Sequence, residues 1–130
     1  ALIAHYALDD VVTRQYGFLS EDDLIAALAP CDLMAFLYGP SAESASGAAR
    51  MALSLNRPIL LSRSEVFRDL WPVSHVARRL DLETVAEAIL ALANDPSLLH
   101  LHDRWRQGFA LAHEWPDVAA RAARLVMKRD

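Results

Sequence analysis

The chain of 130 residues contains little cysteine, glycine and lysine, and each shortage excludes a class of site. The single cysteine, Cys31, excludes an internal disulfide and a thiolate cage around a metal, and it fits a reducing compartment such as the cytoplasm. The 4 glycines fall well below the usual share of roughly 7 %. A glycine-rich phosphate loop is therefore not expected.

Basic residues are also in the minority, with 13 against 17 acidic residues and a formal net charge of −4. All of them except Lys128 are arginine, and no region is basic enough to follow a nucleic-acid backbone. No apolar run approaches the roughly 18 residues of a membrane span, and no signal peptide opens the chain. We therefore expect neither nucleic acid nor a membrane span, while peripheral contact with a membrane stays open.

What the chain does contain is apolar: 54 % of its residues are hydrophobic, which excludes disorder. Its length suits one domain over residues 1–130. Short β-rich or apolar segments alternate with segments that have the apolar spacing of helices. The predicted strands are 11–16, 33–38, 58–61 and 73–79, and the predicted helices are 1–8, a helix from Ser20 to Pro30, 46–56, 64–70, 82–93, 98–114 and one beginning at Trp115.

This order predicts an α/β fold: a Rossmann-like parallel sheet with flanking helices and a helical carboxyl-terminal third. Residues 33–38 show no polar alternation, which is typical of a strand buried on both faces, so we expect them to be the innermost strand. Ligands of such sheets bind beyond the carboxyl ends of the strands. The candidate site is therefore the segment 39–51, which follows this strand and begins a helix.

Small residues at the start of that helix leave its first backbone amides bare, and such amides favour phosphate. Arg50 adds a positive charge on the face of Gly47, and Glu43 can accept hydrogen bonds from sugar hydroxyls. An alternative stays open, in which Ser44 or Ser46 is an ordinary helix cap and Glu43 complements the helix dipole. The candidate residues are Glu43, Ser44, Ala45, Ser46, Gly47, Arg50 and Met51.

From Tyr16 onward the chain resembles the carboxyl-terminal, donor-binding domain of retaining glycosyltransferases of the GT-B class (glycosyl transferases group 1, family 4-like). The resemblance lies in the order and spacing of several segments. They are Tyr16 to Leu24, Cys31 to Phe36, Glu43 to Gly47, Met51 to Leu60, Asn94-Asp95-Pro96 and the helix begun by Trp115.

The resemblance implies transfer of a sugar from a nucleotide-diphosphate sugar to an acceptor, as in polysaccharide biosynthesis, with no metal and no further cofactor. Glu43 matches the family glutamate that contacts the donor sugar. Met51 stands where the family usually has a second glutamate, which binds the ribose hydroxyls, and a thioether cannot accept those hydrogen bonds in the same way. The ribose contact is therefore in doubt.

The family's opening strand, its phosphate-binding segment and its amino-terminal acceptor domain have no counterpart before Ala1. We therefore expect this chain to be a partial donor domain, incomplete at its amino end. We expect it to be inactive alone and to work with an acceptor-binding domain of the same polypeptide.

Two other classes of function stay open. A non-catalytic α/β binding or assembly module is favoured by Met51 and by the low glycine content. A flavodoxin-like receiver fits less well, because Asp9 and Asp10 precede a predicted strand instead of following one.

Outside the segment 39–51, Arg63 and Arg68 flank the loop after the strand 58–61 and are candidate phosphate neighbours. His100 and His102 are two apart on a predicted helix, so they point about 200° apart and cannot share a metal. His75 is isolated in the sequence. No metal site is predicted.

Overall fold

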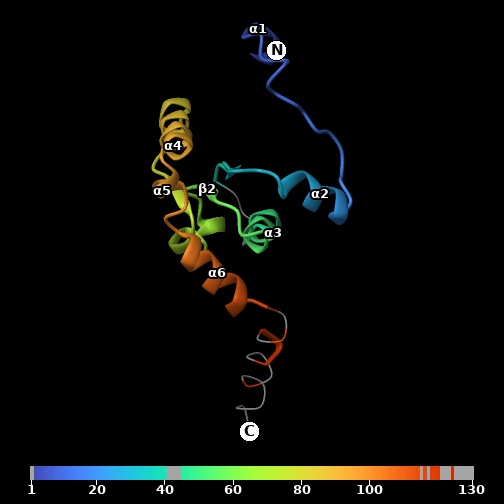
Figure 1. Ribbon diagram of the computed structural model, residues 1–130, viewed down its shortest axis with the longest axis vertical. Coiled ribbons are helices and arrows are strands. Elements are labelled where there is room, and N and C mark those ends of the chain that lie inside the picture. Colours follow the sequence, from blue (N-terminus) through green and yellow to red (C-terminus); the bar gives the residue numbers. More distant parts are fainter. Residues whose placement is uncertain (1, 41–44, 115, 117, 121–123, 125–130) are drawn as a thin grey trace.

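The computed structural model describes residues 2–40, 45–114, 116, 118–120 and 124, and it is a mixed α/β structure (Figure 1). Three short strands and three short connecting turns of helix lie between longer helices. The elements are α1 (Leu2–His5), α2 (Glu21–Leu28), β1 (Met34–Phe36), α3 (Gly47–Ser54), β2 (Ile59–Ser62), the 3₁₀ helices η1 (Glu65–Phe67) and η2 (Trp71–Val73), β3 (His75–Ala77), α4 (Leu82–Asn94), α5 (Pro96–Leu99) and α6 (Asp103–Ala112).

The strands form one parallel sheet in the order β1-β2-β3. Ala35 pairs with Leu60 across the first ladder, and Leu61 pairs with Val76 across the second. The predicted parallel α/β arrangement is thus confirmed at this coarse level. All three strands end at the same edge of the sheet, which is where the connections after them meet.

The central strand, β2, is buried on both faces because helices cover each of them. Ile59 and Leu61 pack with α3, η1 and η2 on one side. Leu60, between them in sequence, points to the other side and packs with residues of α4 and α5. Figure 1 shows α3 and α4 on opposite sides of β2. The core of the molecule therefore consists of two apolar clusters separated by one strand.

Helices α2 and α4 begin at side chains that cap free backbone amides, as the sequence predicted for Ser20. The Asp23 amide donates to Ser20 Oγ at 3.2 Å at the start of α2. The Thr84 amide donates to Asp81 Oδ1 at 2.9 Å at the start of α4. Each cap satisfies a donor that the first helical turn leaves without a backbone partner.

The predicted strand 11–16 is wrong. The segment has no strand partner, Val11 is 76 % exposed, and Figure 1 shows this part of the chain leading away from the sheet toward α1. A strand requires a neighbour for its backbone N–H and C=O groups. Within the part of the chain that the structure describes, no strand lies beside it.

The innermost strand is β2, and the prediction that residues 33–38 hold that place is wrong. These residues do form β1, but β1 lies at an edge of the sheet with β2 as its single neighbour among the described strands. Ala35 is exposed accordingly. An apolar run says that a strand is suited to burial, whereas its position in the sheet depends on which neighbours are present.

The single helix predicted over 98–114 is interrupted between α5 and α6. In a continuous helix the Asp103 amide would donate to the Leu99 carbonyl, but it donates to the His100 carbonyl at 3.1 Å instead. The Leu99 carbonyl lies 3.1 Å from Nε2 of His75 on β3. A side chain of the sheet has thus replaced the helical hydrogen bond.

The other predictions for the middle of the chain hold with shorter elements. The helix predicted over 64–70 is the 3₁₀ helix η1, and the strand predicted over 73–79 is shortened to β3. The helix predicted over 46–56 is α3, although Ala48 on its predicted packed side is exposed. Trp115 lies outside the described residues, as does most of the helix predicted to begin there.

We predict that Leu61→Ala lowers the free energy of unfolding by about 2–5 kcal/mol. Leu61 is fully buried in the central strand, so the truncation leaves a cavity between the sheet and α3. Urea denaturation measures the change. The matched control is Leu82→Ala at a residue that is 86 % exposed, which should change stability by no more than about 0.5 kcal/mol. Equal losses in both variants would contradict the assignment of β2 as the core strand.

Candidate functional site

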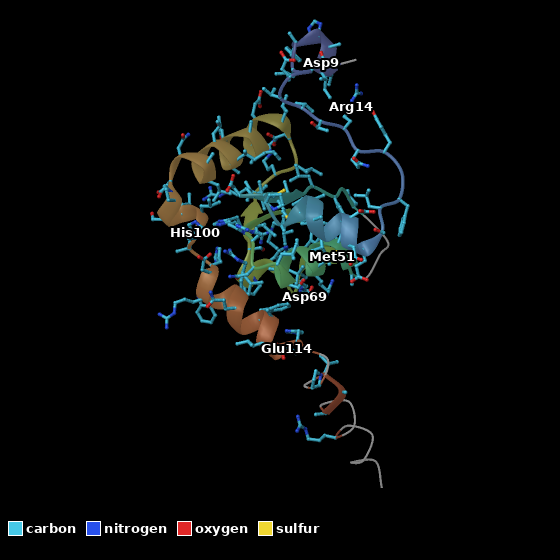
Figure 2. All side chains as sticks on the ribbon, turned by 45° about the vertical axis from the view of Figure 1, so that its right-hand side comes forward. Asp9, Arg14, Met51, Asp69, His100 and Glu114 are labelled. Atoms are coloured by element: carbon cyan, nitrogen blue, oxygen red, sulfur yellow. The ribbon has the colours of Figure 1, made fainter. Side chains whose placement is uncertain are left out.

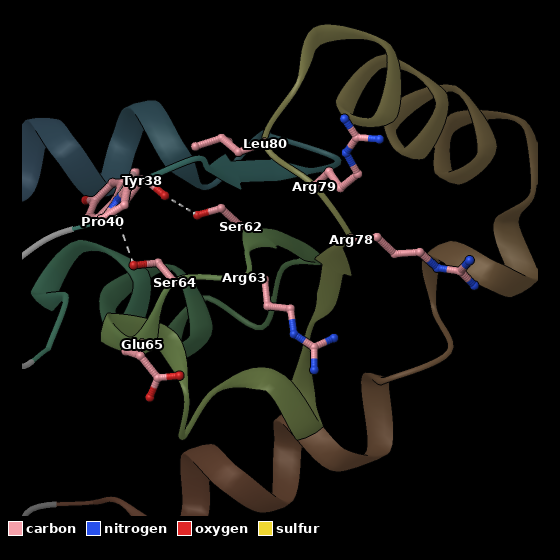
Figure 3. A pocket seen from close by; sticks show the side chains of 10 residues that line it. Tyr38, Pro40, Ser62, Arg63, Ser64, Glu65, Arg78, Arg79 and Leu80 are labelled. Carbon is pink, nitrogen blue, oxygen red and sulfur yellow. Dashed lines mark hydrogen bonds between the residues drawn. The ribbon is translucent and has the colours of Figure 1, made fainter.

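The connections that follow the three strands enclose a hollow of about 490 Å³ at the carboxyl edge of the sheet (Figure 3). Its lining comes from residues 38–40 after β1, 62–65 at the end of β2, and 78–80 after β3. We call it the carboxyl-edge hollow. Its position agrees with the rule that ligands of parallel sheets bind beyond the strand ends.

Serine side chains at the end of β2 fix the wall of the hollow. Ser62 Oγ donates to the Tyr38 carbonyl at 2.6 Å, and Ser64 Oγ donates to the Gly39 carbonyl at 3.3 Å (Figure 3). Both serines are buried, so these hydrogen bonds satisfy carbonyl groups that leave the β1 ladder. The backbone after β1 is thereby held against the backbone after β2.

The hollow carries more positive than negative charge. Arg63, Arg78 and Arg79 line it together with one carboxylate, Glu65. Arg63 lies over the ring of Trp71, 5.5 Å from its centroid, and Arg79 Nε lies 3.0 Å from Asp81 Oδ2. Within the part of the chain that the structure describes, Arg78 has no ion-pair partner. Figure 3 shows the three guanidinium groups pointing in different directions around the hollow.

The carboxylate beside Arg79 is ionised at neutral pH. Hydrogen bonds from Thr84, and more weakly the charge of Arg79, lower the pKa of Asp81 below its usual value. Asp81 therefore serves at once as the cap of α4 and as the counter-ion of Arg79.

The start of α3 is connected to the hollow through Tyr38. Ser46 is buried and its Oγ accepts from the Ala49 amide at 3.3 Å, so the interpretation of Ser46 as a helix cap is confirmed. The Tyr38 hydroxyl lies 3.4 Å from the same oxygen. Ala45 and Gly47 are exposed, and a Cβ added at Gly47 would have no atom within 4 Å. The first turn of α3 is thus open on the side of its small residues.

Arg50 lies elsewhere. Its Nη2 donates to Asp69 Oδ2 at 2.6 Å and its Nη1 donates to the Ser46 carbonyl at 3.1 Å; Figure 2 shows Asp69 next to α3. Arg50 lines a second hollow of about 390 Å³ between α3 and α6, with Phe109 and His113. In this structure its guanidinium is committed to Asp69 and does not face the carboxyl-edge hollow.

The other candidate residues of the segment 39–51 divide into two groups. Glu43 and Ser44 lie outside the described residues. Met51 is half-buried on α3 and does not line the carboxyl-edge hollow. Ser46, Arg50 and Met51 therefore do not line the hollow, although the hydroxyl of Ser46 lies next to that of Tyr38, which does.

Of the two arginines predicted as phosphate neighbours, Arg63 lines the hollow, whereas Arg68 pairs with Glu65 at 3.4 Å and does not line it. Arg78 and Arg79 were not singled out from the sequence. The signal was present, since both residues stand at the carboxyl end of the predicted strand 73–79 and so belong to the same edge.

No family model, no curated protein and no solved structure matches the chain. Among the described residues no group of three or more His, Cys, Asp and Glu side chains is placed to hold a metal ion. Within the same residues, no helix has the length and apolar character needed to cross a membrane.

We predict that Ser46→Ala lowers the free energy of unfolding by about 0.5–2 kcal/mol. Ser46→Gly should lower it by only about a few tenths of a kcal/mol. Alanine removes the oxygen that accepts from the Ala49 amide, whereas glycine leaves that amide open to water. Thermal and urea unfolding measure both changes. An unchanged free energy of unfolding in Ser46→Ala would show that the side-chain cap does not hold the start of α3.

Proposed function

We propose that this chain is the donor-binding part of a retaining glycosyltransferase and binds a nucleotide-diphosphate sugar in the carboxyl-edge hollow. The observation that carries the proposal is the hollow itself, which Arg63, Arg78 and Arg79 line from two strand ends. Its volume of about 490 Å³ falls in the range of roughly 300–1,000 Å³ that is usual for small-molecule sites. Three guanidinium groups against one carboxylate favour a doubly charged ligand such as a diphosphate.

Arginine suits this task because its planar guanidinium makes two parallel hydrogen bonds to phosphate oxygens. The three side chains are exposed, so they can turn toward a bound anion without disturbing the core. The start of α3 lies next to Tyr38 through Ser46, so the positive end of its helix dipole is close to the hollow. In this proposal the positive field comes mainly from the ends of β2 and β3, and Arg50 stays with Asp69.

Glu43 has the role that the resemblance implies: its carboxylate orients the donor sugar by accepting hydrogen bonds from hydroxyl groups. During transfer the bond between the sugar and the diphosphate breaks, and negative charge grows on the leaving phosphate. Arginine side chains that turn toward this oxygen on binding would stabilise the charge as it develops. An acceptor held by an amino-terminal domain of the same polypeptide would supply the attacking hydroxyl group, whose oxygen bonds to the anomeric carbon of the sugar and whose proton passes to the leaving phosphate.

Met51 has a further consequence for this function. A thioether is at most a weak hydrogen-bond acceptor, so the ribose hydroxyls gain little at this position. The diphosphate must therefore supply most of the affinity. We predict that inorganic pyrophosphate and a nucleoside diphosphate bind with dissociation constants within about tenfold of each other. The nucleotide lacks the hydrogen bonds from its ribose to a second glutamate, each of which would be worth about 1.5–3 kcal/mol. Isothermal titration calorimetry compares them, and a much larger preference for the nucleotide would reveal a base or ribose contact elsewhere.

The decisive test removes the positive charges of the arginines that line the hollow. We predict that Arg63→Gln, Arg78→Gln and Arg79→Gln in one chain weaken binding of a nucleoside diphosphate at least tenfold, because the variant loses charged donors to phosphate. The matched control replaces Arg14, Arg57 and Arg104 with glutamine, which changes the net charge equally but leaves the hollow intact. Equal weakening in both variants, or no binding by the wild type, would reject the site.

Glu43 has a separate test. We predict that Glu43→Gln weakens binding of a nucleotide-diphosphate sugar about tenfold and leaves binding of the corresponding nucleoside diphosphate unchanged. The reason is that only the sugar offers hydroxyl groups to this carboxylate, and each charged hydrogen bond is worth about 1.5–3 kcal/mol. Competition titration measures both ligands in the same buffer. Equal effects on the two ligands would remove the sugar contact from the proposal.

A second candidate function is a non-catalytic binding or assembly module, and Met51 is the observation that favours it. Such a module needs no ribose acceptor and no reactive donor. It predicts that neither pyrophosphate nor nucleotide-sugars bind, so the titrations above separate the two functions.

A further inference from the structure

Two histidines that are far apart in the sequence meet where α5 and α6 rest on the sheet. His75 on β3 is 9 % exposed, and its ring contacts the ring of His102, which precedes α6, with centroids 4.9 Å apart and planes at 67°. Prediction from the sequence left His75 isolated, because the contact arises only when the interrupted helix folds back on β3.

His75 also takes over a backbone carbonyl of α5. Its Nε2 lies 3.1 Å from the Leu99 carbonyl, which the break between α5 and α6 leaves without its helical partner. With Nε2–H as the donor, this contact connects β3 directly to the end of α5. The imidazole of His75 therefore links the sheet to the helices that follow it through a hydrogen bond.

A buried guanidinium lies next to this pair. Arg106 on α6 is 1 % exposed and pairs with Asp103, but its Nε and Nη1 have no hydrogen-bond partner among the described residues. Asp103 is shared, since its Oδ2 also lies 3.1 Å from Nδ1 of His100. One carboxylate thus serves a buried cation and a third histidine.

The elements packed around His75 add two more charged groups, which largely offset each other. Arg78 beyond β3 and Glu87 on α4 line the same hollow as His75. From α6 and the turn before it come Asp103, Arg106 and His102. The two arginines and the two carboxylates therefore sum to zero charge before any imidazole gains a proton.

We propose that His75 and His102 form an acid-sensitive latch that holds α5 and α6 against the sheet while both imidazoles are neutral. Protonation would add positive charge to a place that contains the buried guanidinium of Arg106 and a single shared carboxylate. Because charges of like sign repel strongly at short range when they are shielded from water, the docked arrangement loses free energy as each proton binds. Undocking exposes both rings to water and relieves the repulsion.

The direction of the pH effect follows from the environment. Burial, followed by neighbouring positive charge, lowers the pKa of His102 below its ordinary value, and burial likewise lowers the pKa of His75 despite its hydrogen bond to Leu99. The undocked form therefore binds more protons just below about pH 6.5. The stability of the docked state is fully present above that pH and is lost as the pH falls through the lowered pKa values.

Amide hydrogen exchange, followed residue by residue from pH 7.5 to 5, tests the latch. After correction for intrinsic exchange, we expect opening of residues 96–106 to increase up to about tenfold per pH unit for each imidazole that gains a proton. The amides of Leu60 and Leu61 in β2 should show a smaller increase, because the latch does not hold that strand. The carboxyl groups of Asp81 and Asp95, whose pKa values are lowered by hydrogen bonds, titrate below this pH range.

Variants identify the groups responsible. In His75→Gln with His102→Gln the pH dependence of opening should disappear, since a glutamine amide can still donate to the Leu99 carbonyl but does not titrate. His5→Gln is the matched control, at an exposed histidine of α1, and should keep the wild-type dependence. Should the double variant not fold, nuclear magnetic resonance titration of the wild-type imidazoles decides the question. Values for His75 and His102 at or above 6.5, or pH-independent protection of residues 96–106, would overturn the proposal.

Discussion

The burial of β2 on both faces is the constraint on which the rest of the structure depends. Ile59 and Leu61 require cover from α3 and the 3₁₀ helices, while Leu60 requires cover from α4 and α5. With only three strands in the described sheet, this strand is the one that is both paired at each edge and packed on each face. Its position fixes the helices, and the helices in turn fix the direction of the loops at its carboxyl end.

Those loops carry the residues that line the carboxyl-edge hollow. The hydroxyls of Ser62 and Ser64 are used for structure, because they hold the backbone after β1. Arg63, Arg78 and Arg79 are exposed, and two of them have a contact, Arg63 with Trp71 and Arg79 with Asp81. The site thus separates into a fixed wall of serine hydrogen bonds and a set of exposed charged side chains that can rearrange.

Features that depend on neighbouring residues in the sequence could be predicted. Ser20 and Ser46 cap helices through the amide three residues later, so the sequence alone contains the relevant partners. Strand position could not be predicted in the same way. Val11 begins a β-rich segment without a described strand beside it, and Ala35 lies in an apolar run at a sheet edge. In both places the outcome depends on residues far away in the chain.

The candidate site shows the same division. Parallel topology predicted a site at the edge of the sheet where the structure has the carboxyl-edge hollow, and the end of the predicted strand 73–79 already contained Arg78 and Arg79. Arg50 was placed by helix periodicity on the face of Gly47, but its long side chain reaches Asp69, which lies nineteen positions later in the chain. The meeting of His75 with His102 depends on a helix break that periodicity does not reveal, because the apolar spacing continues across it.

The use of arginine, rather than histidine or lysine, around the carboxyl-edge hollow has one more consequence. A guanidinium keeps its proton at any pH that a cell encounters, so acidification cannot discharge this cavity. Of the ligands proposed above, a nucleoside diphosphate has a terminal monoester phosphate that gains its second negative charge at about pH 6, whereas the diphosphate of a nucleotide sugar is esterified at both ends and does not. Binding of a nucleoside diphosphate would then strengthen as the pH rises through this value, while the charges of the three arginines stay constant.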